Sequence, residues 1–128
     1  MSALNEIKAA LRSHLGANYY HEEAPEDATY PYRVGFFGPS FDDDPAEVFA
    51  LEIDYWDEGK STARLDDLID ADAGDGDLIN PTGLNRCRIA VTGGYAVFAY
   101  DTNVPVTDAD KNYRHRRVSY TMRLYRED

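Results

Sequence analysis

The chain has 128 residues and a formal net charge of −11, from 24 acidic and 13 basic side chains. This length allows one domain, residues 1–128, with a core that buries about two thirds of the unfolded surface. The acidic excess disfavours duplex DNA binding by the whole surface, because such binding needs lysine and arginine to neutralise phosphates.

The sequence predicts a soluble protein made in the cytosol, with no membrane contact. No apolar run approaches the roughly 20 residues that span a bilayer, and the N-terminus lacks the basic-then-apolar order of a secretory signal. The single cysteine, Cys87, cannot form an internal disulfide, which agrees with a reducing compartment. Its position on the apolar side of a predicted strand indicates a buried structural thiol.

The first predicted element is an amphipathic helix that Ser2 can cap and Gly16 ends. Its apolar residues recur at spacings of three and four: Leu4, Ile7, Leu11 and Leu15. This stripe predicts one helix face that packs on a core. An irregular acidic connection follows at 17–29.

The clearest strand runs from Val48 to Trp56, where apolar and polar residues alternate. Its predicted inward residues are Phe49, Leu51, Ile53 and Tyr55. Another strand is expected from Tyr30 to Phe37. The segment 38–46 joins the two strands, either as a long hairpin or as a loop that reaches outward. After Gly59, Ser61 or Thr62 can cap a second helix, whose Leu65, Leu68 and Ile69 share one face.

Three more strands are expected near the C-terminus, at Leu84–Thr92, Tyr95–Thr102 and Arg117–Arg126. Gly93 and Gly94 predict a tight hairpin between the first two. On the middle strand the pattern leaves two choices open: either Val97 and Ala99 face inward, or Phe98 and Tyr100 do. The aspartate-rich segment 71–83 lacks the residue order of a calcium loop and is interpreted as a solvated turn.

The order helix, strand, strand, helix, strand, strand, strand predicts an α+β fold. We expect a two-layer sandwich with an antiparallel or mixed sheet of about five strands, covered on one face by the two helices. On the other face, Glu52 and Asp54 would point the same way as three arginines of other strands, if those strands are neighbours. Those arginines are Arg86, Arg88 and Arg123.

No motif in the sequence is specific for catalysis, a metal or a cofactor. The three histidines, His14, His21 and His115, stand singly, without ligand spacing. The sequence has neither a phosphate loop nor a nucleophile elbow. We therefore expect no enzyme activity, no metal and no cofactor.

Other features indicate an interaction surface. Tyrosine, which is enriched where proteins meet, occurs ten times. Predicted connections at 17–29, 38–46 and 103–113 are long for a small chain, and long loops on a compact sheet often serve binding. Acidic loops and an arginine-rich C-terminal segment are unlike patches through which the chain could pack head to tail against copies of itself. The candidate interface residues are Tyr19, Tyr20, Asp42, Asp43, Asp44, Tyr113, Arg114, Arg116 and Arg117.

The succession of elements resembles the tail terminator, or tail completion, proteins of long-tailed bacteriophages. It consists of an LNEIKAALRSHL helix, an acidic loop, a TYPYRVGFF strand, the ALEIDYWDEGKSTARLDDLID strand and helix, and a closing HRRVSYTMRLYRED strand. Its most diagnostic parts are Tyr30 to Arg33 and Leu51 to Leu68. The aspartate-rich loops at 42–44 and 70–77 depart from the family pattern.

This resemblance implies a structural virion protein, made in the host cytoplasm and located at the head–tail junction. It would form a hexameric ring that caps the tail tube, ends tail elongation and provides the surface for head attachment. Its partners would be other copies of itself, the tail tube protein and a head-completion or neck protein. Because each copy carries a net charge of −11, we expect the channel of such a ring to be negative, so that genome DNA passes through it without specific binding. The alternatives are a neck or head-completion adaptor and an acidic DNA mimic that inhibits a nuclease.

Overall fold

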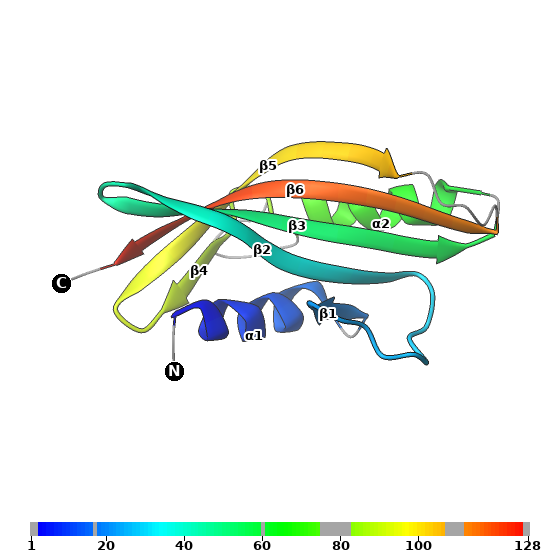
Figure 1. Ribbon diagram of the computed structural model, residues 1–128, viewed down its shortest axis with the longest axis horizontal. Helices are drawn as coiled ribbons and strands as arrows, with labels where there is room; N and C mark the ends of the chain where they lie inside the picture. The colour runs from blue at the N-terminus through cyan, green and yellow to red at the C-terminus, as the bar shows by residue number, and fades with distance from the viewer. Residues whose placement is uncertain (1–2, 17, 60, 75–82, 107–111, 127–128) are drawn as a thin grey trace.

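The computed structural model describes residues 3–16, 18–59, 61–74, 83–106 and 112–126. In these ranges the fold is α+β, with two helices and a mixed sheet of six strands (Figure 1). The elements are α1 (Ala3–Leu15), β1 (Tyr19–His21), β2 (Tyr32–Asp43), β3 (Ala46–Glu58), α2 (Ala63–Ala73), β4 (Arg88–Val91), β5 (Gly94–Val106) and β6 (Tyr113–Arg126). Neither described helix has the length and apolar character needed to cross a bilayer.

The strands lie in the order β1-β2-β3-β6-β5-β4. Only β1 and β2 are parallel, and every other neighbouring pair is antiparallel. The central strand β3 pairs with β6 along its whole length, from Ala46 opposite Tyr125 to Glu58 opposite Tyr113. The sheet curls so that β1 and β4, at its two edges, both contact α1.

The core lies on one face of this curled sheet. The predicted inward residues of β3 are confirmed, because Phe49, Leu51, Ile53 and Tyr55 are all at most 6% exposed. They form one cluster with residues of both helices: Ile7, Leu11, Leu65 and Ile69. On β5, Phe98 is fully buried, so the even positions face the core. Tyr100 shares that side but is 41% exposed.

The structure has one strand more than expected. The extra strand, β1, lies inside the segment 17–29 and pairs with β2 over three residues only, which is too short for a periodic signal. The predicted strand Leu84–Thr92 shortens to β4. The cause is Arg86, whose φ of 64° interrupts the extended backbone.

The segment 38–46 is a long hairpin, the first of the two expected alternatives. Strand β2 continues to Asp43 and β3 begins at Ala46, so only Asp44 and Pro45 form the turn. Strand β5 likewise continues to Val106, into the predicted connection 103–113. Two predicted segments lie partly outside the described residues. The parts outside are 75–82, in the aspartate-rich segment 71–83, and 107–111, in the connection 103–113.

Candidate assembly surface

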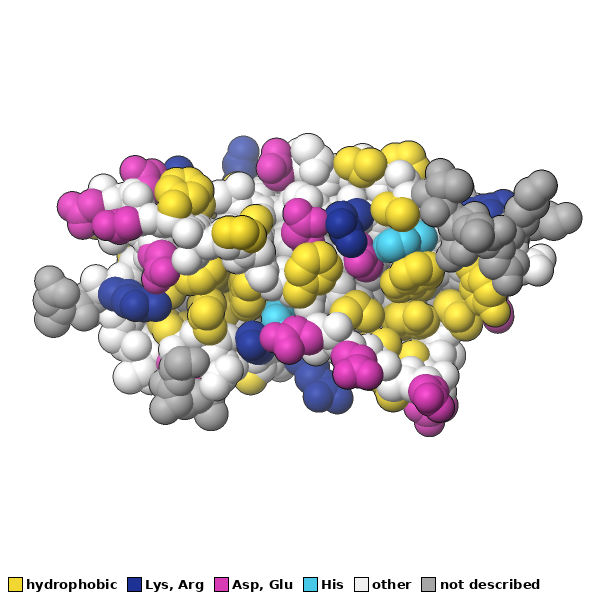
Figure 2. All heavy atoms as spheres, in the orientation of Figure 1, with side chains coloured by type: hydrophobic (Ala, Val, Ile, Leu, Met, Phe, Trp, Pro, Cys, Tyr) yellow, Lys and Arg dark blue, Asp and Glu magenta, His cyan; other side chains and the backbone are white. Residues whose placement is uncertain are grey.

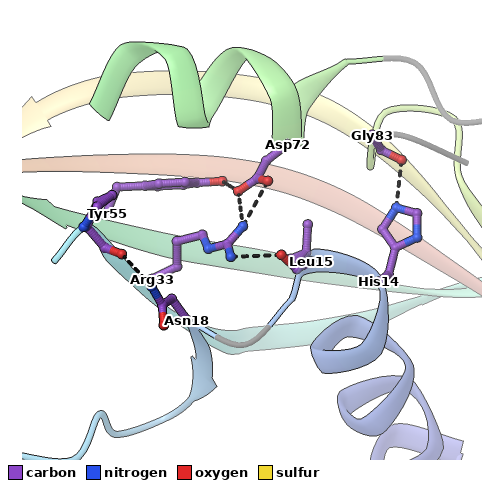
Figure 3. Close-up of polar contacts among 8 residues, drawn as sticks. His14, Leu15, Asn18, Arg33, Tyr55, Asp72 and Gly83 are labelled. Atoms are coloured by element: carbon purple, nitrogen blue, oxygen red, sulfur yellow. Dashed lines mark hydrogen bonds and ion pairs between the residues drawn. The ribbon is translucent and has the colours of Figure 1, made fainter. Parts of the chain in front are cut away.

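A buried polar network joins both helices to the sheet. Arg33 on β2 donates from Nη1 to the two carboxylate oxygens of Asp72 at 2.9 and 2.8 Å. Its Nη2 donates to the carbonyl of Leu15 at 2.8 Å, and the hydroxyl of Tyr55 donates to Asp72 at 2.8 Å. Figure 3 shows the guanidinium between α2 and the end of α1. The arrangement fixes both helices against the sheet.

This network is a structural element of the core. Arg33 and Asp72 are only 4% and 6% exposed, and Tyr55 is fully buried. Burial raises the pKa of Asp72, an effect that the facing Arg33 guanidinium opposes. Burial also raises the pKa of Tyr55 well above its ordinary value. Because all three side chains are enclosed, a substrate has no access to them.

A shallow groove between α1 and β4 has a volume of about 480 Å³, and Ser13, His14 and Cys87 are among the residues that line it. Cys87 is 3% exposed, which confirms the buried thiol expected from the sequence. Burial raises its pKa, so the thiol is a poor nucleophile at neutral pH. One ring nitrogen of His14 lies 2.9 Å from the carbonyl oxygen of Gly83. Within the described ranges, no three histidine, cysteine or carboxylate side chains are placed to hold a metal ion.

Neither of the two described helices covers the opposite face of the sheet. Figure 2 shows hydrophobic side chains gathered on this face over β2 and β3, with charged groups between them. The central charged pair is Asp54 on β3 and Arg117 on β6, joined by hydrogen bonds of 2.7 and 3.1 Å. Arg117 also lies 3.4 Å from Glu52, and its guanidinium is 5.4 Å from the ring centre of Phe36.

Of the three arginines expected on the same face as Glu52 and Asp54, Arg123 alone lies on a strand next to β3, where it is opposite Val48 and pairs with Asp43. Strand β3 neighbours β6, where Arg117 lies opposite Asp54, whereas β4 with Arg88 is three places away in the sheet. Arg88 instead covers the ring of Tyr95 at 3.7 Å. Alternation gives the face on which a residue lies, but the order of strands decides which charges meet.

Aromatic side chains gather at one end of the uncovered face, where β2 and β6 begin and β3 ends. This aromatic end consists of Tyr20, Tyr30, Tyr32, Trp56, Tyr113 and His115, all partly exposed. The ring centre of Tyr30 is 5.3 Å from that of Tyr32 and 5.8 Å from that of Tyr113. Trp56 stacks on His115 at 3.7 Å. Such amphipathic rings suit a surface that alternates between water and a partner.

At the other end, the β2–β3 hairpin projects beyond both helices (Figure 1). Its arm tip consists of Phe41, Asp42, Asp43 and Asp44. Phe41 is 62% exposed, more than the other two exposed large hydrophobic residues described, Val104 at 51% and Tyr100 at 41%. Asp43 pairs with Arg123 at 2.8 Å. One end of the uncovered face thus carries an acidic tip with an exposed apolar side chain, and the other end carries a cluster of aromatic rings.

The predicted interface residues lie in different parts of the structure. Tyr20 and Tyr113 belong to the aromatic end, and Asp42, Asp43 and Asp44 form the arm tip. Tyr19 is fully buried, because its side of β1 faces the core, so its assignment to the interface is corrected. Arg116 and Arg117 point to opposite faces of the sheet. Arg116 lies 3.4 Å from Asp66 of α2 on the helix-covered face, whereas Arg117 pairs with Asp54 on the uncovered face. Arg114 is the second residue of β6 and lies opposite Asp57.

Phe41, Tyr30, Tyr32 and Trp56 were missing from the predicted interface. Phe41 alone had a usable signal, since it is an apolar residue directly before three aspartates. Tyr32 lies in β2, Trp56 lies in β3, and Tyr30 lies just before β2. Alternation gives the face of the sheet on which such residues lie, but it does not show whether other elements cover that face. Comparison of the sequence with protein families and with curated proteins finds no match.

Proposed function

We propose that this chain is a structural protein that assembles with copies of itself into a ring, as a tail terminator of the long-tailed bacteriophage type. The observation that carries the proposal is the uncovered sheet face with unlike ends, the arm tip and the aromatic end. The likeness in the succession of elements supports the specific assignment to tail termination.

Unlike ends favour a particular kind of assembly. A two-fold contact joins the same patch on both subunits, whereas a head-to-tail contact joins two different patches. Head-to-tail contacts close into a ring when the rotation between subunits allows it. Two distinct surfaces at opposite ends of one sheet are what a ring subunit needs.

The charge pattern supports assembly over the DNA-mimic alternative. A mimic would present its carboxylates as a stripe resembling phosphates, but carboxylates on the uncovered face pair with arginines. Asp54 pairs with Arg117, and Asp43 pairs with Arg123. A channel lined by this face would therefore be mixed in charge, which does not support the negative channel expected from the net charge alone.

In the proposed role the ring caps the tail tube, ends its elongation and offers a docking surface to a head-completion or neck protein. The ring would be located in the virion, at the head–tail junction. DNA would pass through it without a specific contact.

The test is the solution mass of the purified chain at increasing concentration, followed by negative-stain imaging of the largest species. A hexameric ring would have a mass of about 86 kDa, six times 14.4 kDa. Adding the protein to tubes assembled from the tail tube protein of the same genome should limit their length. A chain that stays at 14.4 kDa and leaves tube length unchanged would overturn the proposal.

A further inference from the structure

We infer that the arm tip of one copy docks on the aromatic end of a second copy, with Phe41 as the central contact. The inference rests on the proposed self-assembly and names the contact that produces it. The partner surface belongs to the same chain type, so no other protein is needed to form it.

The first support is the apolar chemistry of the two ends. Phe41 is 62% exposed at the end of a projecting hairpin. Its ring would gain most from a site that removes it from water and offers other rings at its edges. The aromatic end provides such a site in Tyr30, Tyr32 and Trp56, which are already in contact with neighbouring rings.

The second support is charge. Asp42 and Asp44 belong to the arm tip and are exposed. On the receiving face, the side chain of Arg117 is 44% exposed and binds Asp54 through Nε and Nη2. Its Nε also lies 3.4 Å from Glu52. A guanidinium carries five N–H donors, so Arg117 retains donors for a third carboxylate. The aspartates of an incoming tip would meet this arginine at the rim of the aromatic end.

The third support is distance, which excludes docking within one chain. The two ends are separated along β3 from Ala46 to Glu58, about 40 Å at the usual rise per strand residue. Strand β3 is paired on both sides over most of this length, so the sheet holds the ends apart. The tip therefore reaches an aromatic end only on another copy.

Strand addition at the sheet edges is a weaker way to join copies. In the described residues, β1 pairs with β2 only up to Gly35, and β4 pairs with β5 only from Gly94 to Val97. The parts of β2 and β5 that these short edge strands leave uncovered each carry a proline, Pro39 on β2 and Pro105 on β5. Prolines remove ladder donors and discourage edge pairing. Contact through side chains fits this surface better.

The direct test is photo-crosslinking from position 41 in the full chain, with p-benzoylphenylalanine in place of Phe41. We expect crosslinks between chains, with the attached peptides covering 30–36, Trp56 or 113–117. The same photoprobe at Tyr100, an exposed aromatic on the helix-covered side, should not give these crosslinks. Crosslinks from position 41 only to other regions, or only within one chain, would overturn the inference.

A mixing experiment tests the unlike character of the two surfaces. Phe41→Asp removes the tip, and Tyr30→Glu damages the aromatic end, with Tyr113→Ser as a second end variant in case Tyr30→Glu misfolds. Each variant alone should be monomeric. An equimolar mixture of a tip variant and an end variant has one intact contact, so it should give a 1:1 complex of about 29 kDa, twice 14.4 kDa. Tyr100→Asp serves as the control and should assemble as the original chain does.

The outcomes separate this inference from the proposed function. If the original chain forms rings and Phe41→Asp forms them equally well, the docking contact is wrong while the ring is retained. If the original chain forms no ring but position 41 crosslinks to the aromatic end of another copy, the contact stands and the ring proposal fails.

Discussion

The two faces of the sheet use tyrosine in opposite ways. On the helix-covered face, Tyr55 and Tyr120 are at most 1% exposed, and Tyr55 donates to the buried carboxylate of Asp72. On the uncovered face, Tyr30, Tyr32 and Tyr113 contact one another and solvent. The strands supply the same residue type to both sides. The helices decide which rings become core and which remain available to a partner.

The difference separates folding from assembly. On the covered face the network of Arg33, Asp72 and Tyr55 is enclosed, so removing one member leaves its partner buried and unpaired. Ion pairs on the uncovered face are partly solvated and contribute little to stability. Substitutions in this buried network should destabilise the fold, whereas those on the uncovered face should mainly weaken the proposed contact between copies.

The largest effect is expected from Arg33→Met, which leaves the Asp72 carboxylate buried without its cation. We expect a loss of about 3–5 kcal/mol in the free energy of unfolding, measured by urea denaturation. The matched control is Arg126→Met, since Arg126 pairs with Glu47 at 3.2 Å but its side chain is 58% exposed. That substitution should cost about 1 kcal/mol or less. Equal losses in the two variants would contradict the distinction between buried and exposed ion pairs.

Alkaline pH should destabilise the chain through its buried tyrosines. Burial raises the pKa values of Tyr19, Tyr55 and Tyr120 above the ordinary value of 10.0. The folded chain then holds protons that the unfolded chain releases, so this stability is present below pH 10 and is lost as pH rises above it. With three such groups, we expect the free energy of unfolding to fall by roughly 3 kcal/mol between pH 10 and 11.

Urea denaturation at several pH values measures this fall, and Tyr55→Phe provides the comparison. Removing one of the three groups should make the decline about one third shallower. A decline of unchanged steepness would show that Tyr55 ionises equally easily in the folded and unfolded chain.

Tyr113→Ala tests the same comparison on the uncovered face. Tyr113 is partly exposed at the start of β6, so its loss should change the free energy of unfolding by about 1 kcal/mol or less. Loss of a central interface ring should weaken assembly at least about tenfold. Sedimentation over a concentration series measures the second effect. A variant that unfolds readily but still assembles would place Tyr113 with the core.

The smallest effect is expected from Arg117→Gln, which removes the charge that faces Asp54 across β3 and β6. Because the side chain of Arg117 is 44% exposed, the stability loss should be about 1 kcal/mol or less and should shrink as salt is added. Thermal melts at low and high ionic strength measure this loss. A loss that does not depend on salt would mean that packing on Phe36, and not charge, holds Arg117.

Local patterns in the sequence predicted much of the fold. Alternation in β3 identified Phe49 to Tyr55 as the inward set, and Gly93 marked the turn between β4 and β5. The sequence failed where neighbours in space decide the outcome. Nothing local distinguishes the buried Tyr19 from the partly exposed Tyr20, and the pairing of Arg33 with Asp72 joins residues from two distant elements. The exposure of Phe41 likewise depends on a hairpin extending past both helices.

The central claim, that the uncovered face is where copies meet, is tested most directly by hydroxyl-radical footprinting at low and high protein concentration. Oxidation of side chains, measured by mass spectrometry, reports their exposure one residue at a time. Our account predicts that Phe41, Tyr32 and Trp56 become protected as concentration rises, while Tyr100 on the other side keeps its reactivity. Protection at Tyr100 with no change at Phe41 and Trp56 would contradict the account and place the contact on the helix-covered side.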